Sequence, residues 1–106
     1  MRRVIKDLKS GGKVYIILIY DIQTITKPGQ RRMRKIFTLS KQYLNHVQKS
    51  VFEGELTESK YMELKSNIED LINAETDSVI FFKSRDEKWL DKEMIGLQED
   101  KTDNFL

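Results

Sequence analysis

The sequence predicts an α+β domain in which two amphipathic helices cover one face of an antiparallel sheet. Two short runs, at residues 14–20 and 79–82, are apolar and rich in β-branched and aromatic residues without alternation, which is typical of strands buried on both faces. Two longer segments repeat apolar residues at helical spacing. The chain has 106 residues, enough for one hydrophobic core and too few for two.

The first strand follows a segment that we expect to lie outside the fold. Residues 1–12 mix charges with little periodicity and end in Ser-Gly-Gly, so they predict a flexible N-terminal extension before a folded domain at 13–97. The strand then covers residues 14–21. Its apolar run is far shorter than the roughly 20 residues that span a bilayer, and no signal-peptide cleavage site precedes it. We therefore expect a cytoplasmic protein with no membrane partner.

Two helices are predicted from their apolar stripes. The first, at about 30–44, follows a loop that holds the only proline, Pro28. Its stripe consists of Met33, Ile36, Phe37, Tyr43 and Leu44. The second, at about 58–73, begins after Thr57, a suitable N-cap. Its stripe consists of Tyr61, Leu64, Ile68, Leu71 and Ile72.

The remaining segments predict further strands. Residues 46–56 have the composition of two short strands or one kinked strand, and residues 79–82 form another strand. A weaker candidate for an additional C-terminal strand lies at 89–96, before a polar tail at 98–106. The order strand, helix, strand pair, helix, strand matches the ferredoxin-like βαββαβ unit, whose helices lie on one face of the sheet.

The uncovered face of such a sheet requires a partner. With only two helices available, a second copy of the chain is the obvious cover, and the additional strand at 89–96 could extend the sheet edge of that copy. We therefore expect a homodimer.

The distribution of charge points to a polyanionic partner. Residues 1–50 carry 12 Lys and Arg against 2 Asp and Glu, whereas residues 51–106 carry 7 against 15. A basic cluster lies at the start of the first predicted helix, where the helix dipole disfavours each cation by about 0.3 to 1 kcal/mol. The cluster consists of Arg31, Arg32, Arg34 and Lys35. It is either a phosphate-binding site, which we favour, or a solvated helix face.

Asp21, at the end of the first strand, has two open interpretations. It could be half of a magnesium site, completed by a symmetry-related Asp21 or by Glu53 or Glu55, because such sites use one or two carboxylates with water and phosphate ligands. It could equally cap a turn through its own backbone. The chain has no cysteine and one histidine, His46, which excludes disulfides, thiolate zinc sites, cysteine nucleophiles and multi-histidine metal sites within one chain.

Aromatic residues offer a weaker signal for nucleic-acid binding. Tyr20, Tyr43 and Trp89 could stack on bases, but aromatics at these spacings are more typical of a core or a dimer contact. For His46 we also favour a structural role, as an ordinary polar residue of the strand pair.

Three segments resemble the CRISPR-associated protein 2 family: VYIILIYDI, RRMRKI and HVQKSVFEGELT, with the resemblance covering roughly residues 13–96. It implies a ferredoxin-like homodimer in which the Asp21 carboxylates of two copies face each other and hold magnesium or manganese. Asp21 then carries the metal-binding and catalytic roles. Arg31, Arg32 and Arg34 match the basic motif that follows it. Two departures are the long lead-in before residue 13 and Asn45-His46, which stands where a glycine turn is common.

The same resemblance implies a role in spacer acquisition. Members of the family bind double-stranded DNA and bridge dimers of the CRISPR-associated protein 1 integrase, and members have been assigned metal-dependent endonuclease activity on RNA or double-stranded DNA. Whether this chain is a magnesium-dependent endonuclease stays open at this point. The alternative is a stand-alone, toxin-like endoribonuclease on the same fold.

Overall fold

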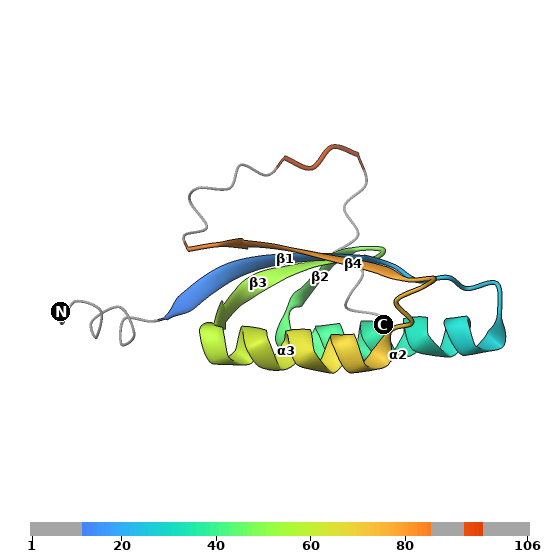
Figure 1. The fold of residues 1–106 in the computed structure, drawn as a ribbon. Coiled ribbons are helices and arrows are strands. Elements are labelled where there is room, and N and C mark those ends of the chain that lie inside the picture. Colours follow the sequence, from blue (N-terminus) through green and yellow to red (C-terminus); the bar gives the residue numbers. More distant parts are fainter. Residues whose placement is uncertain (1–11, 86–92, 97–106) are drawn as a thin grey trace.

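The computed structural model describes residues 12–85 and 93–96 (Figure 1). The described chain follows the predicted order of strand, helix, strand pair, helix and strand. The elements are β1 (Lys13–Asp21), α2 (Lys27–Tyr43), β2 (Asn45–Gln48), β3 (Val51–Thr57), α3 (Glu58–Leu71) and β4 (Ser78–Ser84).

The four strands form one antiparallel sheet with the order β2-β3-β1-β4. Both helices lie against the same face of this sheet, as Figure 1 shows. This is the ferredoxin-like arrangement, so the predicted fold class is confirmed. We call the side of α2 and α3 the helix layer and the opposite side of the sheet the open face.

The core lies between the sheet and the helix layer. Alternate residues of β1 are buried there, and the same side of β3 contributes Phe52, which is completely buried. Ile36 of α2 and Leu64 and Ile68 of α3 close the core from the other side, each at most 1% exposed. Burial of this apolar surface is the main force that holds the helices to the sheet.

The open face is more exposed than the sequence predicted. Ile80 and Phe82 of β4 are 46% and 52% exposed, and they pair directly with the half-buried Ile19 and Ile17 of β1. The expectation of strands buried on both faces therefore holds in the single chain only for the helix side of β1, because β4 has no fully buried residue and its Val79 and Phe81 are half-buried against the core. The physical reason is that no helix or strand within residues 12–85 covers the open face.

The N-terminus of each helix is capped by a threonine. Thr26 accepts a hydrogen bond from the backbone N–H of Gly29 at 3.1 Å, and Pro28 occupies the first turn, where its missing N–H costs nothing. Thr57 accepts from the N–H of Lys60 at 3.1 Å, as the sequence predicted. The first cap makes α2 begin at Lys27, earlier than the expected start near residue 30.

The segment predicted as a strand pair or one kinked strand is a hairpin. β2 and β3 meet at a turn of Lys49 and Ser50, and the pairing shifts register between His46 and Gln48. Lys49 has a φ of 38°, in the left-handed region that a lysine adopts rarely. The turn therefore has a backbone geometry that its composition did not indicate.

Some predictions fall outside the described residues. Of the additional strand expected at 89–96, residues 89–92 lie outside, and residues 93–96 are not in a strand. The tail at 98–106 and residues 1–11 of the N-terminal extension also lie outside, so the domain boundaries stay predictions. Neither helix of the described chain has the length and apolarity to span a membrane.

Candidate nucleic-acid interface

Asp21 is exposed at the end of β1, where it pairs in register with Ser78 of β4. Because side chains alternate along a strand, Asp21 belongs to the open face together with Ile17 and Ile19. Within residues 12–85 and 93–96, no cluster of three or more acidic, histidine or cysteine side chains could hold a metal ion. The described part of one chain therefore offers Asp21 as a single ligand.

Glu53 and Glu55 do not complete a metal site with Asp21 in the same chain. Glu53 pairs with Ile17, four residues before Asp21, which places it about 13 Å away along the strand. Its carboxylate accepts a hydrogen bond from the Tyr15 hydroxyl at 2.7 Å. Glu55 lies farther still, because it pairs with Tyr15. A magnesium site at Asp21 would need a ligand from a second molecule.

Three of the four predicted cationic residues lie together on α2. Arg31, Arg34 and Lys35 are spaced so that they share one helix face, and all three are exposed. They line a shallow hollow of about 510 Å³ together with Thr38, Leu39 and Gln42. Within the described residues, none of the three forms an ion pair. Their charge is available to a partner, and we call these three side chains the α2 cations.

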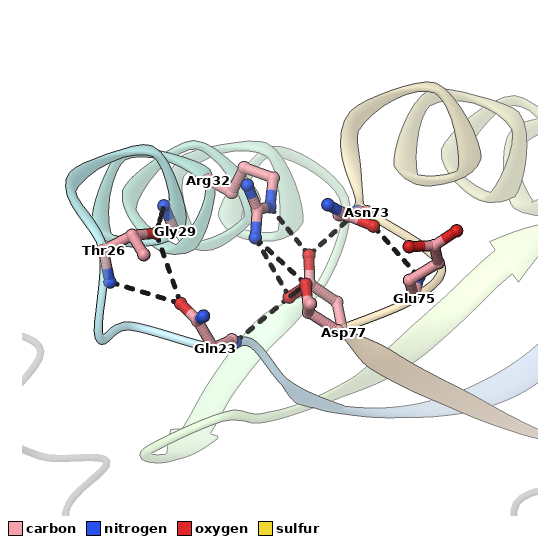
Figure 2. Close-up of polar contacts among 8 residues, drawn as sticks. Gln23, Thr26, Gly29, Arg32, Asn73, Glu75 and Asp77 are labelled. Carbon is pink, nitrogen blue, oxygen red and sulfur yellow. Dashed lines mark hydrogen bonds and ion pairs between the residues drawn. The ribbon is translucent and has the colours of Figure 1, made fainter.

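Arg32 departs from the prediction, because its guanidinium is held inside the protein. Its Nε donates to Oδ2 of Asp77 at 2.7 Å, and its Nη2 donates to Oδ1 at 3.3 Å (Figure 2). The Arg32 side chain is 18% exposed and that of Asp77 is completely buried. A fork that is already engaged by a carboxylate is not free for a phosphate, so the structure favours a structural role for Arg32 over the predicted contact with nucleic acid.

Asp77 is the centre of a polar network that joins three parts of the chain. Besides Arg32 of α2, it accepts from the backbone N–H of Gln23 at 3.0 Å and of Asn73 at 2.9 Å, and from the Thr76 hydroxyl at 3.1 Å (Figure 2). Burial alone would raise the pKa of Asp77, but these donors outweigh it and hold that pKa well below its usual range. Asp77 is therefore charged, and it fixes the loop after β1 against α2.

The sequence did not indicate this network, because Arg32 was grouped with the other cations and nothing in the sequence singled out Asp77. Spacing alone could not have separated Arg32 from the other cations, because Arg32 is three residues before Lys35 and therefore lies close to it on the helix surface.

The aromatic candidates belong to the core. Tyr20 is 4% exposed and stacks on Phe52, with ring centroids 6.1 Å apart. Burial raises the pKa of Tyr20 to about 12, although a hydrogen bond with Ser50 opposes the shift. Tyr43 packs against the core and its hydroxyl accepts from Asn67 at 3.3 Å. Trp89 lies outside the described residues.

His46 contacts two aromatic rings and the hairpin turn. Its ring lies 4.9 Å from those of Phe37 and Phe52, and its Nε2 lies 2.8 Å from the carbonyl oxygen of Lys49. A carbonyl can only accept, so Nε2 carries the proton in this contact. The ring packs among core residues and holds the turn in place.

These features define a small ferredoxin-like protein with a cationic helix face on one side of its sheet and an exposed carboxylate on the other. Residues 14–92 match the family described as CRISPR associated protein Cas2. The chain belongs to this family.

Relatives and solved structures agree with this assignment. A CRISPR-associated endoribonuclease Cas2 of Fusobacterium nucleatum subsp. nucleatum is 52% identical over the full length of both chains. One from Moorella thermoacetica is 47% identical over 86% of this chain and 100% of its own. A crystal structure of Streptococcus pyogenes Cas2 at pH 6.5 has a TM-score of 0.69 and 29% identity, covering 77% of this chain and 99% of that one.

Proposed function

We propose that a dimer of this chain binds double-stranded DNA through the α2 cations and acts in the acquisition of CRISPR spacers. The observation that carries the proposal is the exposure of Arg31, Arg34 and Lys35 on one face of α2, with no ion pair among the described residues. Because α2 begins at Lys27, the α2 cations lie beyond its first turn, and the helix dipole no longer argues for a partner. Three like charges on one helix face repel one another, however, and an external anion would relieve this repulsion. Phosphate groups of a nucleic-acid backbone are such anions.

A second copy of the chain is the partner that best suits the open face. Ile80 and Phe82 expose apolar surface beside Ile17 and Ile19, and a two-fold axis would place this patch against itself. Asp21 lies at the end of the same face, so its symmetry mate is the natural source of a second carboxylate. The α2 cations of both copies would remain outside this contact, because they belong to the helix layer.

The second protein partner in this proposal is the CRISPR-associated protein 1 integrase. The dimer would bridge two integrase dimers, with DNA bound along the basic helices. The excess of Asp and Glu in residues 51–106 supports a protein contact there, because an acidic surface disfavours DNA and suits a basic partner. The role of the chain in this assembly is architectural.

Cleavage of a phosphodiester bond is a separate part of the proposal. The relatives are CRISPR-associated endoribonucleases, which supports RNA as a substrate beside double-stranded DNA. Two Asp21 carboxylates from two copies could hold magnesium or manganese, a type of ion that supplies Lewis-acid catalysis in phosphodiester hydrolysis. Asp21 and the α2 cations lie on opposite sides of the sheet. Variants of one site should therefore affect DNA binding or phosphodiester cleavage without affecting the other. The alternative is a stand-alone, toxin-like endoribonuclease on the same fold; the relatives' names support the endoribonuclease part of it but link that activity to CRISPR.

Two variants separate these roles. Asp21→Ala removes the carboxylate from the open face, and Arg31→Gln/Arg34→Gln/Lys35→Gln removes the α2 cations. We expect Asp21→Ala to abolish any magnesium-dependent cleavage of RNA or DNA while DNA binding and spacer acquisition persist. The triple variant should lose DNA binding and acquisition together. The measurements are gel-shift affinity, cleavage of labelled RNA and DNA, and acquisition in cells.

The outcomes that would contradict the proposal differ between the two variants. Loss of acquisition in Asp21→Ala would show that the role is more than architectural. Normal spacer acquisition by the triple variant would show that acquisition does not depend on the α2 cations. A gene neighbourhood that lacks an integrase and a repeat array would favour the toxin-like alternative.

A further inference from the structure

A groove of about 1080 Å³ separates α2 from the turn between β2 and β3. One wall belongs to α2 and the other to the turn. None of the described residues that line it is acidic. They are Tyr20, Thr24, Gln30, Met33, Arg34, Phe37, Thr38, His46, Lys49 and Ser50.

The groove combines an apolar floor with cationic walls. Met33, Phe37 and His46 contribute apolar and aromatic surface, and Arg34 of α2 and Lys49 of the turn contribute positive charge. Hydroxyl and amide side chains from the same list can donate and accept hydrogen bonds. An occupant that matches this chemistry has a flat aromatic part, polar edges and a negative charge, which together describe a nucleotide.

The turn wall is held in one conformation. Nε2 of His46 donates to the carbonyl of Lys49 at 2.8 Å, and this contact supports the left-handed backbone of Lys49, whose φ is 38°. His46 is in turn fixed between Phe37 and Phe52. Because the turn is fixed before any ligand arrives, Lys49 is presented at the groove without the cost of ordering a loop.

The groove is continuous with the surface proposed for DNA binding. Arg34 and Thr38 line both the groove and the hollow that contains Arg31 and Lys35. A nucleic-acid strand that follows the α2 cations would therefore pass the mouth of the groove. In a duplex, both faces of each base are stacked against neighbours, so only an unpaired nucleotide could place its base inside.

We propose that this groove binds one unpaired nucleotide of a nucleic-acid strand, with the base over the apolar floor and a phosphate between Arg34 and Lys49. The inference rests on the proposed function and adds a preference for a strand that contains an unpaired nucleotide. Lys49 sets this preference, whereas the α2 cations bind backbone phosphates in any strand.

The test compares two lysine variants on two probes. Lys49→Gln removes the cation from the turn, and Lys65→Gln makes the same change on α3, outside the groove. The probes are a labelled unpaired oligonucleotide and a blunt duplex long enough to stay base-paired, with lengths chosen so that both carry the same number of phosphates. We expect Lys49→Gln to weaken binding of the single strand by about fivefold or more and of the duplex by less than about twofold. Lys65→Gln should change neither.

A second readout locates the ligand. Met33 lies in the groove, and His46 gives the only imidazole signals of the chain, so both can be followed by NMR. The methyl resonance of Met33 and the ring resonances of His46 should shift with the single strand and saturate. They should shift less with inorganic phosphate or with the duplex, which can reach Arg34 but place no base over the apolar floor. The unchanged His46 signals of free Lys49→Gln would show that the variant is folded.

Two results would overturn the groove site. One is an equal loss of single-strand and duplex affinity in Lys49→Gln, and the other is a single strand that binds without shifting Met33. Either result leaves duplex binding by the α2 cations intact, because that binding is measured on the duplex with the triple variant. Failure of the groove site is therefore distinguishable from failure of the proposed function.

Discussion

Arg31 and Arg32 are neighbours in the sequence, yet their guanidinium groups have different surroundings. Arg31 is exposed beside the other α2 cations, whereas Arg32 is bound to the buried carboxylate of Asp77. A carboxylate that is buried with an arginine and two backbone amides stabilises the fold only while it is charged. At the residue scale, one basic cluster therefore divides into three exposed cations and one structural ion pair.

Asp77→Asn tests the structural ion pair. The amide removes the negative charge that balances Arg32, so we expect the free energy of unfolding at pH 7 to fall by about 3 kcal/mol. The pKa of Asp77 is lower in the folded state than its ordinary value of 3.8, so the ionised carboxylate stabilises the fold fully above pH 3.8. This contribution to stability is lost progressively as the pH falls below 3.8. The measurement is urea denaturation of both proteins at several pH values.

The pH dependence supplies the control for this prediction. The difference in stability between the wild type and Asp77→Asn should shrink as the pH decreases from 4 toward 2. A difference that stays constant over this range would mean that the variant acts through shape and not through charge.

Contacts of a few residues in the first turn of α2 fix the position at which this helix begins. The N-terminus is capped by Thr26, and Gly29 packs so closely on the preceding loop that a Cβ at this position would overlap the backbone oxygen of Gln23. In the same loop, the backbone N–H of Gln23 donates a hydrogen bond to the carboxylate of Asp77. The cap, the glycine and the ion pair together fix where α2 begins, and so where its cations lie.

Gly29→Ala should therefore disturb this turn although alanine is the better helix former. Any side chain at residue 29 must push the loop of Gln23 away, so we expect a loss of about 1 to 3 kcal/mol in stability by denaturant unfolding. Gln42→Ala, at an exposed position of the same helix, is the matched control and should change stability by less than about 0.5 kcal/mol. A stabilised Gly29→Ala protein would contradict the close packing described for this turn.

The elements themselves were predictable because each has a strong local signal. The apolar run gave β1 within one residue, and Thr57 gave the start of α3. The early start of α2 has a local signal, since Thr26 is its N-cap and Pro28 lies in its first turn, but the apolar stripe that predicted the helix begins only at Met33. The position of the hairpin turn was not predictable, because it depends on the left-handed backbone of Lys49 and on how His46 packs between Phe37 and Phe52 in the folded chain.

At the scale of the whole molecule, the sheet separates two surfaces. The helix layer carries the α2 cations, and the open face carries Asp21 with the exposed Ile80 and Phe82. The sequence predicted both Asp21 and the uncovered face, but it did not place Arg32 with Asp77, because that pair is 45 residues apart in the chain. The division explains how one small domain could bind DNA on one side and a second copy on the other.

Phe82→Asp tests the role of the open face. A buried, unpaired carboxylate at the centre of the proposed dimer contact is costly, so we expect Phe82→Asp to be a monomer with unchanged secondary structure where the wild type is a dimer. Met62→Asp, on α3, is a matched control because Met62 is 54% exposed and Phe82 is 52% exposed. Sedimentation equilibrium and circular dichroism measure both variants. A Phe82→Asp protein that remains a dimer would show that the copies associate through another surface.

The salt dependence of duplex binding tests the central claim most directly. Each phosphate contact that a cation makes contributes about 0.9 to the slope of log affinity against log salt concentration. For the wild type against Arg31→Gln/Arg34→Gln/Lys35→Gln, we predict a slope that becomes shallower by about 2 to 3 and an affinity that falls at every salt concentration. An unchanged slope in the triple variant would contradict the assignment of the α2 cations as the DNA-binding surface.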